Sequence, residues 1–498
     1  MLTANHWTGH HGHSRCRFLL CPNLNQGYDQ GHVVWTGKAF TAQFPEIDTT
    51  TGAGGSASLQ GTVVAIYEIG CFFGALIALL IGEKIGRRKT IMLGCAILSI
   101  GGALQASAYG IPHLIVGRIV AGLGNGLNTS TIRQFLSAPS VSPSLSIELA
   151  INIFGVMTAY WVDYGMSFVD HSSVQFRFPL ALQCLFAVCT LVGIMFLPES
   201  PRCSSPTATS TKLATSCDEV SVIQHAIERK RLAAEGGSFK ALLKNGPQKF
   251  FYRTMLGIGG QFMQQISGIN LITYYAPVIF EQSVGMSRDL SLLLAGFNGV
   301  AYFFSSLVPI WVIDRLGRRK LMLFAVTGQC ACMAILAGTV SDGGRAAGIV
   351  AIIMLFLFNF FFAVGLLAIP WLLPAEYAPL AIRSKAAALA TASNWIFTFL
   401  VVEITPVSIA NIQWRTYVYF SVFNFLFIPL VYFFYPETRN LSLEQIDKLF
   451  TGDKVMLHWT PSMGSVGDPV SSSGLRRRHS STADKVSDTS VQVENSTV

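Results

Sequence analysis

Three amide side chains stand close together in an otherwise apolar stretch of the chain. Gln264, Gln265 and Asn270 lie in a span rich in Gly, Ile and Tyr. In a helix, this spacing lines one broad face with amides. A buried amide needs hydrogen-bond partners, and a hydroxylated ligand supplies donor and acceptor pairs that suit it. Neighbouring membrane helices supply such partners as well, so the three residues by themselves leave ligand binding and interhelical bonding both open.

No set of residues indicates covalent chemistry, because we find no activated nucleophile, cofactor loop or set of metal ligands. Residues 122–126 (GLGNG) imitate a phosphate loop, but no strand precedes them, so close helix packing by small residues is the better interpretation. The histidines at 6, 10, 11 and 13 lie in a segment that looks foreign to the rest. We therefore expect a protein that is not an enzyme and that has no cofactor and no metal site.

The composition defines the elements that must position these amides. Of the 498 residues, 51% are apolar and 12% are charged, against roughly 25% charged in soluble proteins. This excludes a disordered chain, a coiled coil and an ordinary cytosolic enzyme, and it leaves an all-α polytopic membrane protein. The net charge of +8 is carried in short runs beside apolar stretches, which suits anionic lipid rather than nucleic acid. Ten scattered cysteines indicate neither a disulfide framework nor a zinc site.

About eleven stretches are long enough to cross a bilayer, and they must be helices because lipid tolerates no open sheet edge. Glu68 and Glu403 lie within two of them, and the sequence assigns these carboxyls no role. The expected spans are 59–82, 90–108, 114–132, 147–169, 179–197, 254–280, 290–313, 321–340, 346–373, 385–410 and 416–435.

Basic residues gather on one side of these spans. The breaks at 82–89 and 314–320 are basic, and the segment 199–253 holds nine Lys and Arg. Breaks on the opposite side are poor in such residues, so the positive-inside rule places the rich side in the cytoplasm. This predicts a multi-pass protein with both termini in the cytoplasm.

Two motifs recur along the chain at almost the same period. Gly86 and Gly317, each followed by two arginines, lie 231 residues apart, and the Pro-Glu pairs that begin at Pro198 and Pro436 lie 238 apart. Two homologous halves of six helices are therefore expected. Symmetry demands twelve spans, so the first helix is degenerate in this chain.

Three segments look out of place in this plan. Residues 1–26 are too polar to cross a bilayer, residues 133–146 look like a Ser/Pro-rich linker, and residues 203–217 are of low complexity. The expected organisation is an anomalous segment at 1–26, a six-helix bundle at 27–202, a cytoplasmic loop at 203–250, a second six-helix bundle at 251–440, and a cytoplasmic tail at 441–498 that is disordered from about 460.

With these motifs in order, the chain resembles the sugar-porter branch of the major facilitator superfamily, and most of all fungal hexose and polyol transporters. The three segments that look out of place depart from the family pattern, which suggests errors in the gene structure or a decayed gene. The motifs that carry the resemblance are GYDQG at 27–31, the two GRR breaks, Gly117-Arg118, PESPR at 198–202, Gln264-Gln265, Gly268-Ile269-Asn270, Pro370-Trp371, Pro374-Ala375-Glu376, Pro436-Glu437-Thr438 and LEQID at 443–447.

The resemblance implies the major facilitator fold and uptake of a sugar or polyol by alternating access, with proton symport. It implies that Asp29 exchanges the proton beside Arg118, where the alternative is a fixed pair that locks two helices. Pro370, Pro374 and Gly365 predict a broken helix beside the site. Substrate contacts are implied for Gln264, Gln265, Asn270, Asn298, Trp371 and Asn394, an outer gate for Tyr274 and Tyr275, and a cytoplasmic charge network for Arg87, Arg88, Glu199, Arg318, Arg319, Glu376, Arg383 and Glu437.

The expected partners are a small sugar or polyol, a proton and membrane lipid, for a monomer in the plasma membrane that binds no nucleic acid. Three alternatives remain at this point. Facilitated diffusion would not alkalinise the medium, whereas symport would. A non-transporting nutrient sensor would signal through a long tail, but only about 60 residues follow the last helix. The third alternative is an inactive product of a faulty gene model.

Overall fold

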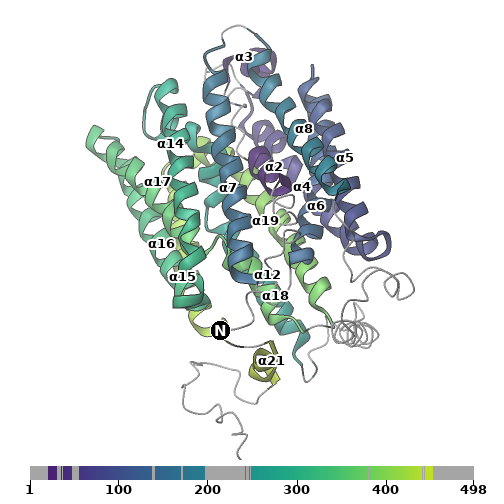
Figure 1. Cartoon of the computed structure of the whole chain (residues 1–498). Coiled ribbons are helices and arrows are strands. Elements are labelled where there is room, and N and C mark those ends of the chain that lie inside the picture. The colour runs from purple at the N-terminus through teal and green to yellow at the C-terminus, as the bar shows by residue number, and fades with distance from the viewer. Residues whose placement is uncertain are drawn as a thin grey trace, which may run out of the picture. The chain divides into compact units, whose positions relative to one another are not determined.

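The computed structural model describes residues 21–30, 35, 37–47, 55–136, 141–169, 172–196, 242, 246, 248–379, 381–439, 441 and 443–451. Within these ranges the regular elements are helices, and there is no strand. In Figure 1 the long helices run roughly along one axis, with α5, α6 and α8 on one side of the bundle and α14, α16 and α17 on the other.

The first half of the described chain consists of α2 (Cys21–Gln30), α3 (Lys38–Gln43), the 3-10 helix η3 (Pro45–Ile47), α4 (Ala57–Ile85), α5 (Arg87–Ala106), α6 (Ile111–Leu136), α7 (Val141–Met166) and α8 (Val174–Met195). The second half consists of α12 (Phe250–Ile266), α13 (Ile269–Val278), the π-helix η4 (Ile279–Ser283), α14 (Arg288–Leu307), α15 (Pro309–Leu316), α16 (Arg318–Asp342), α17 (Arg345–Gly365), α18 (Ile369–Tyr377), α19 (Arg383–Ile412), α20 (Arg415–Phe434) and α21 (Leu443–Thr451).

Nine helical stretches in the described part are long and apolar enough to cross a membrane. Two of the eleven expected spans, 114–132 and 254–280, are not among them. The first corresponds to α6, whose polar residues Asn125, Asn128 and Thr131 are buried inside the protein. The second is divided into α12 and α13 by Gly268, which has φ +100°. Both nevertheless run through the bundle in contact with qualifying helices, α6 with α4 and α5 and α12 with α19.

Close packing of small residues explains the position of α6. A Cβ atom on Gly122 would lie 2.1 Å from Tyr67 O, and one on Gly126 would lie 2.1 Å from Cys71 O, so both glycines face α4. Gly124 faces α5, where a Cβ atom would lie 2.5 Å from Leu98 N. The interpretation of residues 122–126 as a helix-packing segment is therefore confirmed.

The first helix extends further than we expected. Helix α2 begins at Cys21, within the segment considered anomalous, and packs against α7 and α8. Its approach to α7 is tight, because a Cβ atom on Gly155 would lie 2.2 Å from Leu24 O. The short helix is thus held by backbone contact with a neighbour rather than by its own apolar length. Residues 1–20 lie outside the described part.

The expected Ser/Pro-rich linker at 133–146 is largely helical, so that expectation is wrong. Helix α6 continues to Leu136 and α7 begins at Val141. Pro143 lies in the first turn of α7, where its missing N–H needs no helical partner. The segment 203–217 lies outside the described residues.

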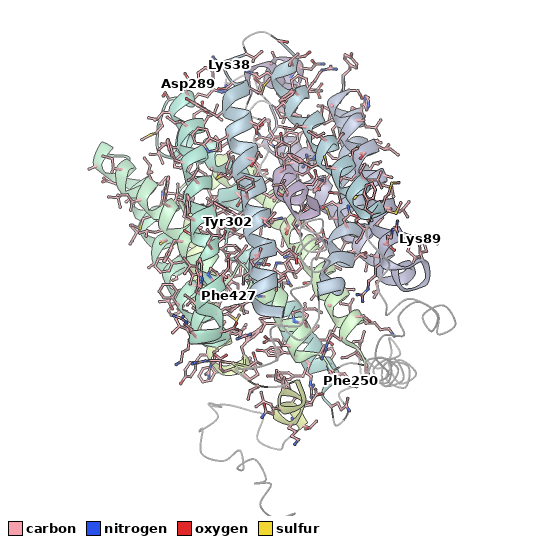
Figure 2. All side chains as sticks on the ribbon, in the orientation of Figure 1. Lys38, Lys89, Phe250, Asp289, Tyr302 and Phe427 are labelled. Carbon is pink, nitrogen blue, oxygen red and sulfur yellow. The ribbon has the colours of Figure 1, made fainter. Side chains whose placement is uncertain are left out.

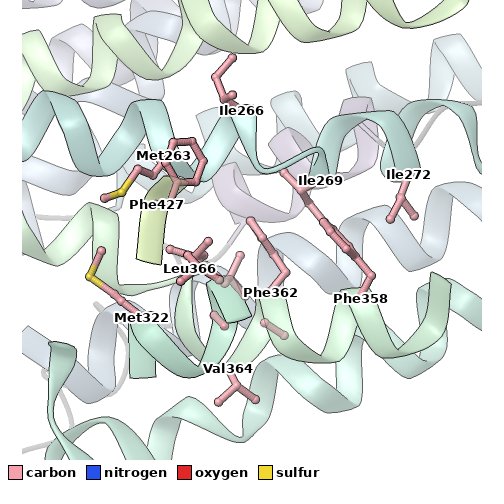
Figure 3. Packing of buried hydrophobic residues seen from close by; sticks show 14 of the residues in the cluster. Met263, Ile266, Ile269, Ile272, Met322, Phe358, Phe362, Val364, Leu366 and Phe427 are labelled. Carbon is pink, nitrogen blue, oxygen red and sulfur yellow. The ribbon is translucent and has the colours of Figure 1, made fainter. Parts of the chain in front are cut away.

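A broken helix was predicted around Trp371, and it is present. Helix α17 ends at Gly365 and α18 begins at Ile369. The core of the second half surrounds this break. Figure 3 shows Ile269 on the side of Phe362 and Met263 beside Phe427, and these residues of α12, α13, α17 and α20 belong to one apolar cluster.

The bundle has two distinct ends. Lys38 and Asp289 lie at one end and Phe250 lies at the other (Figure 2). We call the end with Lys38 the far end, and the end with the α4–α5 and α15–α16 turns the basic end. At the basic end α21 packs beneath α12, since Arg253 pairs with Asp447 and its guanidinium lies 4.5 Å from the centre of the Phe450 ring.

A candidate substrate cavity between the halves

A cavity of about 70 Å³ lies between the two halves of the bundle. By size it holds a few water-sized groups. None of the described residues that line it is charged, and six of them are amides. The first half contributes Gln26, Leu149, Asn152, Ile153 and Val156, and the second half contributes Gln264, Gln265, Ile269, Asn270, Thr273, Tyr302, Phe362, Leu367, Trp371, Asn394 and Thr398.

Gln264 joins three helices at the edge of this cavity. Its Nε2 donates to Leu366 O at 2.8 Å and to Leu367 O at 3.0 Å, which are carbonyls left free by the break between α17 and α18. Its Oε1 accepts a hydrogen bond of 3.1 Å from Asn394 Nδ2. Gln264 therefore makes the interhelical bonds of one interpretation, and because it also lines the cavity, ligand binding stays a prediction for it.

Asn394 completes a chain of amides from α12 to α19. Its Nδ2 also donates to Gln261 Oε1 at 2.7 Å, and Gln261 Nε2 donates to Pro370 O at 3.0 Å. Each donor in this series of hydrogen-bonded amides has a buried acceptor, so the amides that line the cavity are held in one orientation before any ligand binds.

Gln265 and Asn270 come together because the helix breaks between them. Gly268 takes a left-handed conformation that other residues adopt only at a cost. The turn allows Asn270 Nδ2 to donate to Gln265 Oε1. Gln265 Nε2 also donates to Gln264 Oε1 at 3.4 Å, within the described part of the chain Asn270 Oδ1 accepts no hydrogen bond, and both residues line the cavity. The pair therefore offers a ligand both a donor and an acceptor.

Asn298 does not line the cavity, whereas the other five residues for which substrate contact is implied do. Its Oδ1 accepts a 3.0 Å hydrogen bond from Asn359 Nδ2, which ties α14 to α17. Tyr302, one helical turn later on α14, lines the cavity in its place. A residue on the same helix face but one turn away cannot be distinguished by spacing alone.

Sequence reasoning missed five polar lining residues, one of which is Thr273 on α13. Gln26 lay in the segment considered anomalous, Asn152 was one polar residue in an apolar span, and Tyr302 and Thr398 carried no motif. Thr398 follows Asn394 by one helical turn, so the spacing contained a usable signal. Asn152 and Gln26 supply the first half's polar contribution to the cavity.

Tyr274 and Tyr275 lie outside the cavity lining, toward the far end of the bundle, in a buried cluster with Trp35 and Val402. The Tyr274 hydroxyl donates to Glu68 Oε1 at 2.6 Å, and the Tyr275 hydroxyl donates to Val402 O at 3.1 Å. The outer-gate role implied for Tyr274 and Tyr275 stays a prediction.

Asp29 and Arg118 are buried, with exposed fractions of 4% and 2%, and neither lines the cavity. Arg118 Nη2 donates to Val64 O at 2.6 Å, and its guanidinium lies 4.5 Å from the centre of the Trp35 ring. Glu68 lies one turn after Val64 on α4, close enough to Asp29 and Arg118 for their charges to influence its carboxyl. The structure therefore brings a cation and two carboxyls into one dry region next to the tyrosine pair.

The charged residues at the basic end fall into two groups. In the second half, Arg318 pairs with Glu376 at 3.0 Å and with Asp314 at 3.1 Å. Glu437 accepts from the backbone N–H groups of Arg318 at 2.8 Å and Arg319 at 3.0 Å, so it caps the start of α16. In contrast, Arg383 Nε donates to Ala378 O at 3.1 Å.

In the first half, Arg88 Nη2 donates to Met195 O at 2.6 Å, which ties α5 to α8. Arg87 also lies at the start of α5. Glu199 lies outside the described residues. The contacts described for the network thus join helix ends within each half.

Replacing Gly317 by alanine is expected to destabilise the protein. Gly317 has φ +94° and ψ 164°, a conformation open mainly to glycine, which costs another residue about 1–3 kcal/mol. A Cβ atom there would also lie 2.5 Å from Glu437 Oε2, which cannot withdraw without losing the cap of α16. Gly343→Ala is the matched control, because Gly343 has φ +69° but no atom near its Cβ position. Thermal unfolding in detergent should show the larger loss for Gly317→Ala, and equal losses would contradict the role given to Glu437.

Comparison with known proteins gives matches over most of the chain. A family model described as "Sugar (and other) transporter" matches residues 19–450. The MFS-type transporter oryC of Aspergillus oryzae is 37% identical over 454 residues, which cover 86% of this chain and 84% of that protein. Sugar transporter STL1 of Saccharomyces cerevisiae is 35% identical, with 85% of this chain and 78% of that protein covered.

More distant proteins share the fold. A quinate permease of Neurospora terricola is 29% identical, with 85% of this chain and 86% of that protein covered. The structure of the proton:xylose symporter XylE bound to 6-bromo-6-deoxy-D-glucose superposes with a TM-score of 0.71 at 24% identity, covering 88% of this chain and 98% of that one. The chain belongs to the sugar transporter family of the major facilitator superfamily and is a multi-pass membrane transporter, not an enzyme.

Proposed function

We propose that the protein moves a neutral polyhydroxylated molecule, a sugar or a polyol, across the plasma membrane by alternating access and together with a proton. The observation that carries the substrate class is the uncharged, amide-rich cavity between the two halves. Amide groups both donate and accept hydrogen bonds, which matches vicinal hydroxyls, and the Trp371 ring offers a face for the C–H side of a sugar.

A carboxylate substrate fits this lining less well. Quinate is an anion, and one of the relatives is called a quinate permease. Burying an anion requires a cation or several directed N–H donors. No described lining residue is cationic, and the Gln261, Gln264 and Asn394 donors are already bonded to protein acceptors. A neutral substrate leaves no charge to compensate.

We place the proton-exchange site outside the substrate cavity. Asp29 and Arg118 are buried outside the cavity. A buried carboxyl near a guanidinium can hold or release a proton as its surroundings change. We assign proton exchange to Asp29, with the basic end facing the cytoplasm as the positive-inside rule requires. We also propose that the transporter works as a monomer.

Uptake into liposomes that contain the purified full-length chain tests the substrate class. We expect neutral hexoses, pentoses or linear polyols to exchange across the membrane at rates at least tenfold above empty liposomes, with quinate at the background rate. Transport of quinate and of no neutral compound would overturn the proposed class. Exchange without alkalinisation of the medium would keep the substrate class and replace symport by facilitated diffusion.

A further inference from the structure

Glu68 is a buried carboxyl that neither the cavity nor the charge network uses. Its side chain lies within α4 at 0% exposure. Its Oε1 accepts the 2.6 Å hydrogen bond from the Tyr274 hydroxyl on α13, 206 residues further along the chain. Because α4 belongs to the first half and α13 to the second, this bond connects the halves that alternating access must separate.

A second bond ties α13 to the first half on its other side. Pro277 has no N–H, so the carbonyl of Thr273 four residues earlier loses its helical partner. The Tyr160 hydroxyl on α7 donates to Thr273 O instead. Helix α13 is therefore held to α4 through Glu68 and to α7 through Tyr160.

The backbone at both ends of α13 is suited to movement. Gly268 has φ +100° before the helix, Tyr275 departs from helical geometry with φ −123° and ψ 18°, and a π-helix follows from Ile279 to Ser283. Irregular helix geometry of this kind often marks a hinge or a functional site. Asn270 and Tyr274 lie on this segment between two irregular points, so displacement of α13 moves a cavity amide and a Glu68 contact together.

The surroundings of Glu68 connect it to the proposed proton site. Five ionisable groups lie close enough to interact electrostatically with the Glu68 carboxyl. They are Asp29 on α2, Arg118 on α6, Tyr274 on α13, and Tyr67 and Cys71 on α4 itself. Within the described part of the chain, Glu68 Oε2 is buried without a hydrogen-bond partner. Purely structural buried carboxyls usually have both oxygens satisfied, so this one is suited to a change of partner.

We infer that Glu68 is a positioning residue that closes the far end of the cavity by accepting the Tyr274 hydroxyl, with Tyr160 as the second tie on α13. Breaking the Glu68–Tyr274 bond favours the state in which the two halves separate at that end. This inference rests on the proposed function, because it assigns the closing step of the same transport cycle.

Removing the hydroxyl alone gives the sharpest test. Tyr274→Phe and Glu68→Ala should each shift the balance toward the open far end by about tenfold, the effect of losing one buried hydrogen bond to a carboxyl. Glu68→Gln keeps a carbonyl oxygen as acceptor and should stay near wild type. Tyr435→Phe is the matched control, since its hydroxyl donates to Leu256 O at 2.9 Å within the second half.

Hydrogen–deuterium exchange of the purified full-length protein reads this balance without any substrate. We expect faster exchange in residues 57–68 and 269–278 for Tyr274→Phe and Glu68→Ala, and no further change when the two are combined. In liposomes, both variants should lower the half-saturation concentration on the far side and slow turnover. Tyr274→Phe removes one oxygen atom only, so it tests the inference even if Glu68→Ala fails to fold.

The results that overturn the inference are specific. Additive effects of the two substitutions, equal exchange in Tyr274→Phe and Tyr435→Phe, or a Glu68→Gln variant that behaves like Glu68→Ala would each exclude a bond-specific closing role. If no neutral substrate is transported, the proposed function fails, and the exchange measurement still decides whether Glu68 and Tyr274 hold the two halves together.

Discussion

Asp29→Asn is expected to abolish accumulation of substrate against its gradient while leaving exchange of substrate intact. The asparagine keeps the shape of the buried side chain but cannot take up or release a proton. One pH unit across the membrane is worth 1.36 kcal/mol, or about a tenfold accumulation ratio for one proton per substrate. The ratio should fall to about one in the variant, because substrate then moves only down its own gradient. Liposomes loaded at a higher internal pH provide the measurement.

Asp163→Asn is the matched control for this result. Asp163 is a second buried aspartate in the described part of the first half, with 8% of its surface exposed, and it lies on α7. We expect it to keep pH-driven accumulation. If accumulation survives in Asp29→Asn and is lost in Asp163→Asn, the proton site is Asp163 on α7 and not Asp29. If both variants accumulate substrate, neither aspartate couples proton movement to transport.

Asn394→Ala is expected to raise the half-saturation concentration for substrate by about tenfold to a hundredfold, with little change in the maximal rate. The substitution removes a cavity amide, leaves Gln261 Oε1 without its donor, and leaves Gln264 Oε1 with only the 3.4 Å bond from Gln265 Nε2. An unsatisfied buried polar group costs about 1–3 kcal/mol, which corresponds to this range of affinity. Exchange rates measured over a range of substrate concentrations separate the two kinetic constants.

Asn424→Ala distinguishes lost binding from lost stability. Asn424 is also a fully buried amide, and its Nδ2 donates to Ser267 O and Phe420 O, each at 2.9 Å, but it does not line the cavity. Both variants should unfold at lower temperature than wild type, and only Asn394→Ala should change the half-saturation concentration. An equal change in Asn424→Ala would mean that packing of the second half, rather than contact with substrate, sets the apparent affinity.

Much of this protein was determined by local sequence. Apolar length and the scarcity of charge predict membrane helices, because lipid leaves the backbone no other regular structure that ends within one segment. Turn chemistry is local as well. Gly317 followed by two arginines predicts the turn into α16, and the prolines around Trp371 predict the break between α17 and α18, which the structure contains. Four of the five implied substrate residues that line the cavity stand in short motifs of neighbouring residues, namely Gln264, Gln265, Asn270 and Trp371.

The tertiary structure decided which of these residues meet. Helix α2 is too short and polar to be recognised as a span, and only its close approach to α7 brings Gln26 to the cavity. Asn298 bonds to Asn359, and Tyr302 lines the cavity instead. This difference depends on how α14 and α17 pack. The Glu68–Tyr274 bond joins residues 206 positions apart. A single sequence does not show such contacts. The partners that side chains find on other helices are fixed by packing and not by spacing along the chain.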